Sequence, residues 1–150
     1  MDTLTFALEI TQPVEEYQFY ELAIALFVNG ESLNPVALAA LDIVELYYSA
    51  REAGSYFIWT CGCGSPECGG IHWGVRVAHA AATVTWQVAT LPFRYTPTGF
   101  LTFDKAAYQA TTQRLVEECL AYVRGYQAAG MKIELTSCPH AIERKLADCR

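Results

Sequence analysis

The sequence predicts an α+β fold: a mostly antiparallel sheet of about six strands, with two main helices packed on one face. Three observations lead to this prediction. Several short segments alternate apolar and polar residues, which is the pattern of half-buried strands. Turn signals such as Asn29-Gly30 indicate hairpins between such strands. Two longer segments have helical spacing, and the resulting order places groups of strands between helices instead of alternating strand and helix strictly.

The first half of the chain contains two expected strands and the first expected helix. Residues 4–10 and 20–28 alternate with a period of two, so we expect each to form a half-buried strand. Asn34 precedes a proline, and proline is favourable at the first position of a helix. The apolar residues at 36–48 fit one helix, which we expect to close at Gly54 because glycine readily adopts the left-handed conformation.

The second half of the chain begins with further expected strands. Residues 56–60 predict a short strand that leads into a cysteine-rich segment. Residues 71–77 and 84–88 alternate again, so we expect them to form a hairpin that turns at residues 79–82. A loop should follow this hairpin, since the next residues include Pro92, Pro97 and Gly99.

A long second helix is expected to begin after Asp104, a residue type that caps helix N-termini, and to end near Gly130. Helical spacing places a set of apolar side chains on one stripe of it: Tyr108, Leu115, Cys119, Tyr122, Val123 and Tyr126. Residues 131–135 then predict a final strand, and residues 142–149 predict a weak basic helix.

Length and composition indicate a single domain, residues 1–150. The chain is 53% hydrophobic and 17% charged, which is enough apolar material for one core and for a dimer interface. Ten Lys and Arg residues against sixteen Asp and Glu residues give a net charge of −6. This charge disfavours nucleic acid as a ligand, since binding phosphate calls for a basic surface. We therefore expect a protein partner or a homodimer.

Neither a membrane segment nor an export signal is expected. No apolar run approaches the roughly 18 residues that a membrane helix needs. The sequence starts with MDTLTFALEITQ, which lacks the basic region of a signal peptide. We therefore expect a cytoplasmic protein. Cysteines stay reduced in that compartment, and a cluster of them indicates metal or catalysis more than disulfides.

The main chemical signal is the pattern C-x-C-x4-C-x3-H, made by Cys61, Cys63, Cys68 and His72. Zinc prefers four sulfur and nitrogen ligands in a tetrahedral arrangement, which tight turns bring together. Four glycines lie within this segment, and glycine allows the positive φ angles and close approaches that such turns require. The segment therefore predicts a structural Zn²⁺ site with these four ligands.

Several alternatives to this site stay open. The fourth ligand could instead be His79, Cys138 or His140. The cysteines could pack as small apolar groups around a turn without metal. Cys61 and Cys63 could form a thiol redox couple, although few neighbouring cations are available to lower the pKa of either thiol. An open site with three cysteines and a water would make a zinc-dependent hydrolase.

The remaining candidate residues favour structural roles. Cys119 lies on the apolar stripe of the long helix, so we expect it in the core. Asp42 and Glu45 lie three residues apart on the first expected helix, which is more typical of a solvated face than of an acid/base pair. No nucleophile elbow, phosphate loop, dinucleotide fingerprint or zinc-protease motif is present in the sequence.

The segment Thr60-Cys61-Gly62-Cys63-Gly64, followed by Cys68-Gly69 and by Val84-Thr85-Trp86, resembles small uncharacterised bacterial proteins. Those proteins carry a C-x-C-G…C segment between strands and then a V-x-W strand. The resemblance covers residues 57–103 and implies an α+β fold, with no activity to transfer. Together with the residue patterns, it favours a non-catalytic protein-interaction module with a zinc knuckle. An immunity or antitoxin-like protein, whose acidic surface covers a basic toxin, is one version of this hypothesis.

Overall fold

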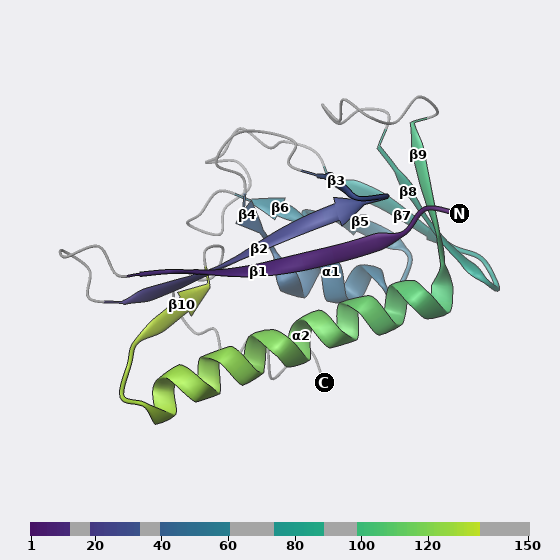
Figure 1. The fold of residues 1–150 in the computed structure, drawn as a ribbon. Helices are drawn as coiled ribbons and strands as arrows, with labels where there is room; N and C mark the ends of the chain where they lie inside the picture. Colours follow the sequence, from purple (N-terminus) through teal and green to yellow (C-terminus); the bar gives the residue numbers. More distant parts are fainter. Residues whose placement is uncertain (13–18, 34–39, 61–73, 89–98, 136–150) are drawn as a thin grey trace.

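The computed structural model describes residues 1–12, 19–33, 40–60, 74–88 and 99–135 (Figure 1). Within these ranges the chain is an α+β protein of two helices and ten strands, which confirms the predicted fold class. All strand pairs are antiparallel except one, but the strands divide among three sheets instead of forming one. The elements are β1 (Leu4–Thr11), β2 (Tyr20–Val28), β3 (Glu31–Ser32), β4 (Ala40–Leu41), α1 (Ile43–Ser49), β5 (Gly54–Tyr56), β6 (Trp59–Thr60), β7 (Val75–His79), β8 (Thr83–Gln87), β9 (Phe100–Asp104), α2 (Lys105–Ala128) and β10 (Ile133–Leu135).

The first sheet has the order β1-β2-β10, with β3 paired to one end of β2. Strands β1 and β2 pair antiparallel along their length, from Leu4 opposite Val28 to Thr11 opposite Glu21. The turn predicted after β2 is confirmed, because Asn29 and Gly30 have φ angles of 54° and 83°. Strand β10 runs parallel to β2 on the other side, as a chain returning from a long helix can do.

The second sheet has the order β5-β7-β8-β9, and all its pairs are antiparallel. The predicted hairpin is confirmed as β7 and β8, with a turn closed by a 2.9 Å hydrogen bond from the Ala80 amide to the Thr83 carbonyl. Strand β9 was not predicted. It lies directly after the expected loop and pairs with β8, for example Phe103 opposite Val84. The predicted strand at 56–60 is in fact split between β5 and β6, which belong to different sheets.

The first helix begins later than predicted. Ala40–Leu41 is a strand that pairs with β6, and α1 starts at Ile43 instead of residue 36. The reason is the cap: the Asp42 carboxylate accepts hydrogen bonds from the amides of Val44 (3.0 Å) and Glu45 (3.3 Å). The helix ends at Ser49, so Gly54 is not its cap but the first residue of β5.

The second helix matches its prediction closely. Asp104 caps α2 by accepting a 2.8 Å hydrogen bond from the Ala107 amide, and Gly130, just after the helix, has a φ angle of 75°. Most of the predicted stripe is buried, but Tyr122 is 42% exposed and lies outside the core. No described helix is long and apolar enough to cross a membrane. The helix expected at 142–149 falls outside the described residues.

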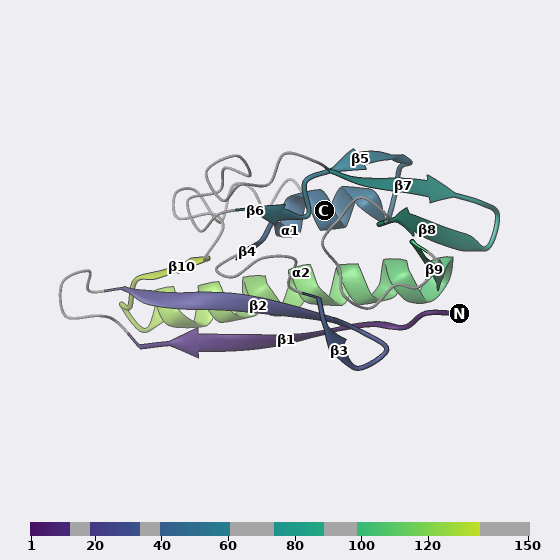
Figure 2. The ribbon, with the colours of Figure 1, turned by 90° about the horizontal axis from the view of Figure 1, so that it is seen from above.

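Helix α2 connects the two larger sheets. It starts at the end of β9, runs beneath β1 and β2, and ends beside β10 (Figures 1 and 2). Helix α1 lies next to it on the same side of the first sheet (Figure 1). One continuous hydrophobic cluster includes residues of both large sheets and both helices, so the described elements share one core.

Candidate functional site

The four predicted zinc ligands, Cys61, Cys63, Cys68 and His72, lie outside the described residues, as do the alternatives Cys138 and His140. Within the described ranges, no group of three or more His, Cys, Asp or Glu side chains could hold a metal ion. The described residues nearest to the predicted site are those on either side of the cysteine segment. Several of these residues contact the core.

The chain entering the cysteine segment is fixed by several interactions. Trp59 and Thr60 in β6 are only 4% and 1% exposed, and the Trp59 ring packs edge-on to Trp86 with 5.9 Å between ring centroids. Just before them, the Ile58 carbonyl accepts a 2.7 Å hydrogen bond from the Asp42 amide. The predicted solvated pair Asp42 and Glu45 thus has specific roles, since Asp42 caps α1 and the Glu45 carboxylate accepts a 2.9 Å hydrogen bond from the Phe57 amide.

The chain leaving the segment is held closely against β5. A Cβ atom on Gly74 would lie 2.6 Å from the Ser55 Oγ atom and 3.2 Å from the Tyr56 carbonyl oxygen. Any other residue here would force Ser55 and the backbone at Tyr56 to shift, so glycine favours this close approach. The next residue, Val75, is 2% exposed and lies opposite Tyr56 in the sheet. The exit from the segment is thus as firmly placed as the entry.

The two ends of the segment also lie near each other. Val75 pairs with Tyr56, so their Cα atoms are about 5 Å apart. Thr60 is four residues after Tyr56, a span of at most about 14 Å. Thr60 and Val75 therefore lie within roughly 20 Å, whereas the fourteen residues between them would span about 48 Å if extended. The chain between them is long enough for the expected ligands to meet, which is a necessary condition for a closed zinc site.

His79, the only alternative fourth ligand within the described residues, has a structural contact. It lies at the far end of β7, four residues or about 13 Å from Val75. Its Nε2 atom is 2.8 Å from the Ser49 carbonyl oxygen at the end of α1. This carbonyl belongs to the last turn of the helix, where backbone acceptors lack helical partners, so the imidazole caps α1 from a neighbouring sheet.

A buried polar network beside this region was not predicted from the sequence. The Trp86 Nε1–H group donates to the Tyr108 hydroxyl oxygen at 3.0 Å, and that hydroxyl lies 2.7 Å from the Ser49 Oγ atom. Ser49 in turn donates to the Leu46 carbonyl at 2.6 Å. Because Ser49 donates there, Tyr108 donates to Ser49, and each polar group has a partner. The three residues come from β8, α2 and α1, so no local sequence pattern could have indicated their contact.

Burial raises the pKa of two side chains in the core, Tyr108 and Cys119. Burial raises the pKa of the Tyr108 hydroxyl well above its usual value, and its hydrogen bonds with Ser49 and Trp86 offset only part of that effect. Burial also raises the pKa of Cys119 to about 12, with a smaller contribution from the charge of Glu118. The thiol therefore stays neutral at pH 7 and is a poor nucleophile. The prediction that Cys119 is a core residue is confirmed.

Comparisons with known proteins give no match: no family model, no curated protein and no solved structure is similar to the chain. The resemblance of the cysteine segment to small bacterial proteins thus stays a prediction. A function must be inferred from the chemistry of the chain's own residues.

Proposed function

We propose that this chain is a non-catalytic, cytoplasmic protein-interaction module that holds a structural zinc ion through Cys61, Cys63, Cys68 and His72. One observation carries the proposal: a four-ligand pattern lies between two anchors, Thr60 and Val75, that are buried and near each other. Nearby anchors allow the four ligands to converge, which a closed metal site requires.

The anchors determine what the zinc would stabilise. Thr60 pairs with Ala40 and Val75 pairs with Tyr56, and neither of these partners is a predicted metal ligand. Metal binding would then order only the segment between them, instead of folding the whole chain as in a classical zinc finger. We therefore expect removal of zinc to leave the far-UV circular dichroism spectrum nearly unchanged while it makes the segment accessible to proteases.

The roles of the described titratable groups support a non-catalytic protein. Asp42 and Asp104 cap helices, and His79 contacts a helix carbonyl. Tyr108 is hydrogen-bonded in the core, and the thiol of Cys119 is buried and neutral. Each of these groups is engaged in holding the fold together. A general acid or base would instead be placed at a cleft with a pKa near the working pH.

The net charge of −6 supports a basic protein as the partner. Opposite charge accelerates association and favours the correct partner over others. An immunity or antitoxin-like role is the specific version of this proposal, and a basic toxin encoded next to this protein would be the expected ligand.

Elemental analysis of the protein, purified without chelator, tests the metal site. We expect one zinc per chain in the wild type, and loss of zinc in Cys61→Ser and Cys68→Ser. Cys119→Ser is the matched control, because Cys119 is in the core and should not affect zinc content. Less than one-tenth of an equivalent of zinc in the wild type would overturn the proposal. A Cys61–Cys63 disulfide found by mass spectrometry in that case would indicate the redox alternative.

The His72→Ala variant then separates a structural site from an open one. A structural site with His72 as ligand should lose zinc and protection from proteases together. An open site with three cysteines should keep its zinc, which would support the hydrolase alternative. Cys138→Ser and His140→Ala identify the fourth ligand if zinc is present but does not depend on His72.

A further inference from the structure

Strand β1 has an unpaired edge within the described part of the chain. The Asn29 amide donates to the Thr3 carbonyl at 2.9 Å, so the odd-numbered residues of β1 direct their backbone groups toward β2. The backbone groups of the even-numbered residues Phe6, Leu8 and Ile10 must then point the other way. The register of β2 agrees, since its even-numbered residue Leu26 accepts from Leu33 on the side away from β1.

Among the described residues, only the start of this edge is covered. The Asp2 amide donates to the Thr102 carbonyl at 2.7 Å, and the Asp2 carboxylate accepts from the Thr102 amide at 2.7 Å. These bonds join the beginning of the chain to β9 and occupy the outward side of β1 before Leu4. The outward backbone groups from Phe6 to Ile10 have no strand beside them among the described residues. Such a row of donors and acceptors is a template for another strand.

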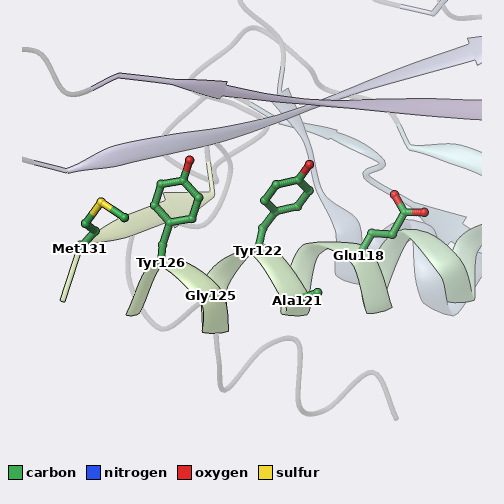
Figure 3. Close-up of a pocket in the computed structure, with 6 residues that line it drawn as sticks. All are labelled: Glu118, Ala121, Tyr122, Gly125, Tyr126 and Met131. Carbon is green, nitrogen blue, oxygen red and sulfur yellow. The ribbon is translucent and has the colours of Figure 1, made fainter. Parts of the chain in front are cut away.

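An apolar groove lies on the same side of the molecule. It has a volume of about 640 Å³ and is lined by Glu118, Ala121, Tyr122, Gly125, Tyr126 and Met131. Figure 3 shows Tyr122 and Tyr126 directed from α2 toward the strands of the first sheet. The Arg114 guanidinium, one turn before Glu118, lies 5.0 Å from the centroid of the Phe6 ring, so this side of α2 faces β1. Phe6, Leu8 and Ile10 are themselves only half-buried.

We propose that two copies of this chain form a twofold dimer, in which β1 pairs antiparallel with β1 of the second copy. The sheets would join into one continuous sheet, β10-β2-β1-β1-β2-β10, with both α2 helices on the same face. Tyr122, which is 42% exposed, would then lie on the side of α2 that faces the second copy and lose contact with water. This inference goes beyond the proposed function, because its surface contains no residue of the cysteine segment.

The backbone restricts the register of the proposed pairing, and the free part of the edge then selects among the allowed registers. Only even-numbered residues have outward backbone groups, so an even residue must pair with an even one. A twofold axis at Leu8 pairs Phe6 with Ile10 of the second copy and uses the free part of the edge, without displacing β9 from Asp2. This register places Glu9, the only charged residue of β1, opposite Ala7 and not opposite another carboxylate.

The charge of the surface favours a second copy over a basic partner. Arg114 and Glu118 lie 3.7 Å apart at the groove and balance each other, so the groove and edge carry little net charge despite the −6 of the chain. A basic protein would gain little by binding here, whereas an apolar, self-complementary surface suits an isologous contact.

Two substitutions at one exposed position test the dimer. Ala7→Glu would place a carboxylate opposite Glu9 of the second copy, twice by symmetry, and Ala7→Lys would place an ammonium group there. We expect the dissociation constant to be about tenfold larger for the Glu variant than for the Lys variant, because two cross-strand pairs change sign. Sedimentation velocity of the full chain over a concentration series measures this constant.

Further variants distinguish an effect on dimer formation from an effect on folding or on zinc binding. Tyr122→Glu should also weaken the dimer, whereas Gln127→Glu, exposed elsewhere on α2, should not. Circular dichroism confirms that each variant is folded. The dimer should persist in Cys61→Ser, so failure of the zinc proposal and failure of this one are distinguishable. A wild-type chain that stays monomeric at about 100 µM would overturn the proposal, as would equal dissociation constants for the two Ala7 variants.

Discussion

Strands β1 and β8, one from each of the two larger sheets, carry similar apolar patterns but differ in how far their side chains are buried. In β8, Val84 and Trp86 are 0% exposed because β7 and β9 flank the strand and α2 covers its face. In β1, Phe6, Leu8 and Ile10 are only half-buried, and among the described residues a strand lies on one side alone. Neighbouring strands, and not the alternation itself, decide the burial of a strand. Strand β8 is therefore closed within the core, whereas β1 has the edge on which the proposed dimer depends.

The largest expected effect comes from replacing one aromatic residue in each of these two strands and comparing the loss of stability. Trp86→Ala should lower the free energy of unfolding by about 3–5 kcal/mol, because it leaves a large cavity in the core. Phe6→Ala should lower it by less than about 2 kcal/mol, because that ring is only partly buried. Urea denaturation of both variants, at a protein concentration low enough for monomers, measures the difference. Equal losses would mean that the edge of β1 is covered as completely as β8.

Much of this architecture could be predicted, because its signals are local. The alternation at β1, β2 and β8, the Asn29-Gly30 turn and the Asp104 cap each determine structure within a few residues. Predictions were wrong where one pattern permits two structures. The apolar run before α1 fits a strand as well as a helix, and pairing with β6 together with the Asp42 cap decided between them. Strand β9 was missed because it is short and directly follows a segment with two prolines and a glycine, which indicated only a loop.

The candidate site likewise has features that a local sequence pattern indicates and features that only the tertiary fold brings together. The cysteine spacing can be recognised from the sequence because its ligands lie within twelve residues, Cys61 to His72. The contact between Ser49 and Tyr108 joins residues that are 59 positions apart, so only the tertiary fold brings them together. The requirement for glycine at position 74 likewise comes from a neighbouring strand and not from a turn.

The stability of the protein at alkaline pH should show how fully the core around Cys119 is shielded from water. The pKa of Cys119 is near 9 in an unfolded chain and about 12 in the folded protein. Between these values the unfolded thiol loses its proton and the folded thiol keeps it, so stability falls as pH rises, by about 1.4 kcal/mol per pH unit. Urea denaturation from pH 8 to 11 measures the slope. Cys119→Ala should have a shallower slope than the wild type, and an unchanged slope would show that the thiol is not shielded from water.

The hydroxyl of Tyr108 provides the next test. Tyr108→Phe keeps the ring but leaves Trp86 Nε1–H without its acceptor and Ser49 Oγ without its donor. We expect a loss of about 1–3 kcal/mol, the cost of leaving buried polar groups unsatisfied. Tyr122→Phe is the matched control, because that ring is 42% exposed and its hydroxyl can bond with water. Its effect on the monomer should be close to zero, and thermal unfolding of both variants checks the contrast.

The smallest expected effect is at the open groove. Arg114 and Glu118 form an ion pair with 3.7 Å between Nε and Oε1, and their side chains are 60% and 45% exposed. Water and salt screen such a pair, so Glu118→Gln should change the unfolding free energy of the monomer by less than about 0.5 kcal/mol. The measurement is urea denaturation at two salt concentrations, and the difference between variants should shrink at the higher one. A loss above about 1 kcal/mol in the monomer would mean that the pair is buried by other parts of the chain. The face of α2 beside β1 would then be closed like the second sheet, and no longer available to a second copy.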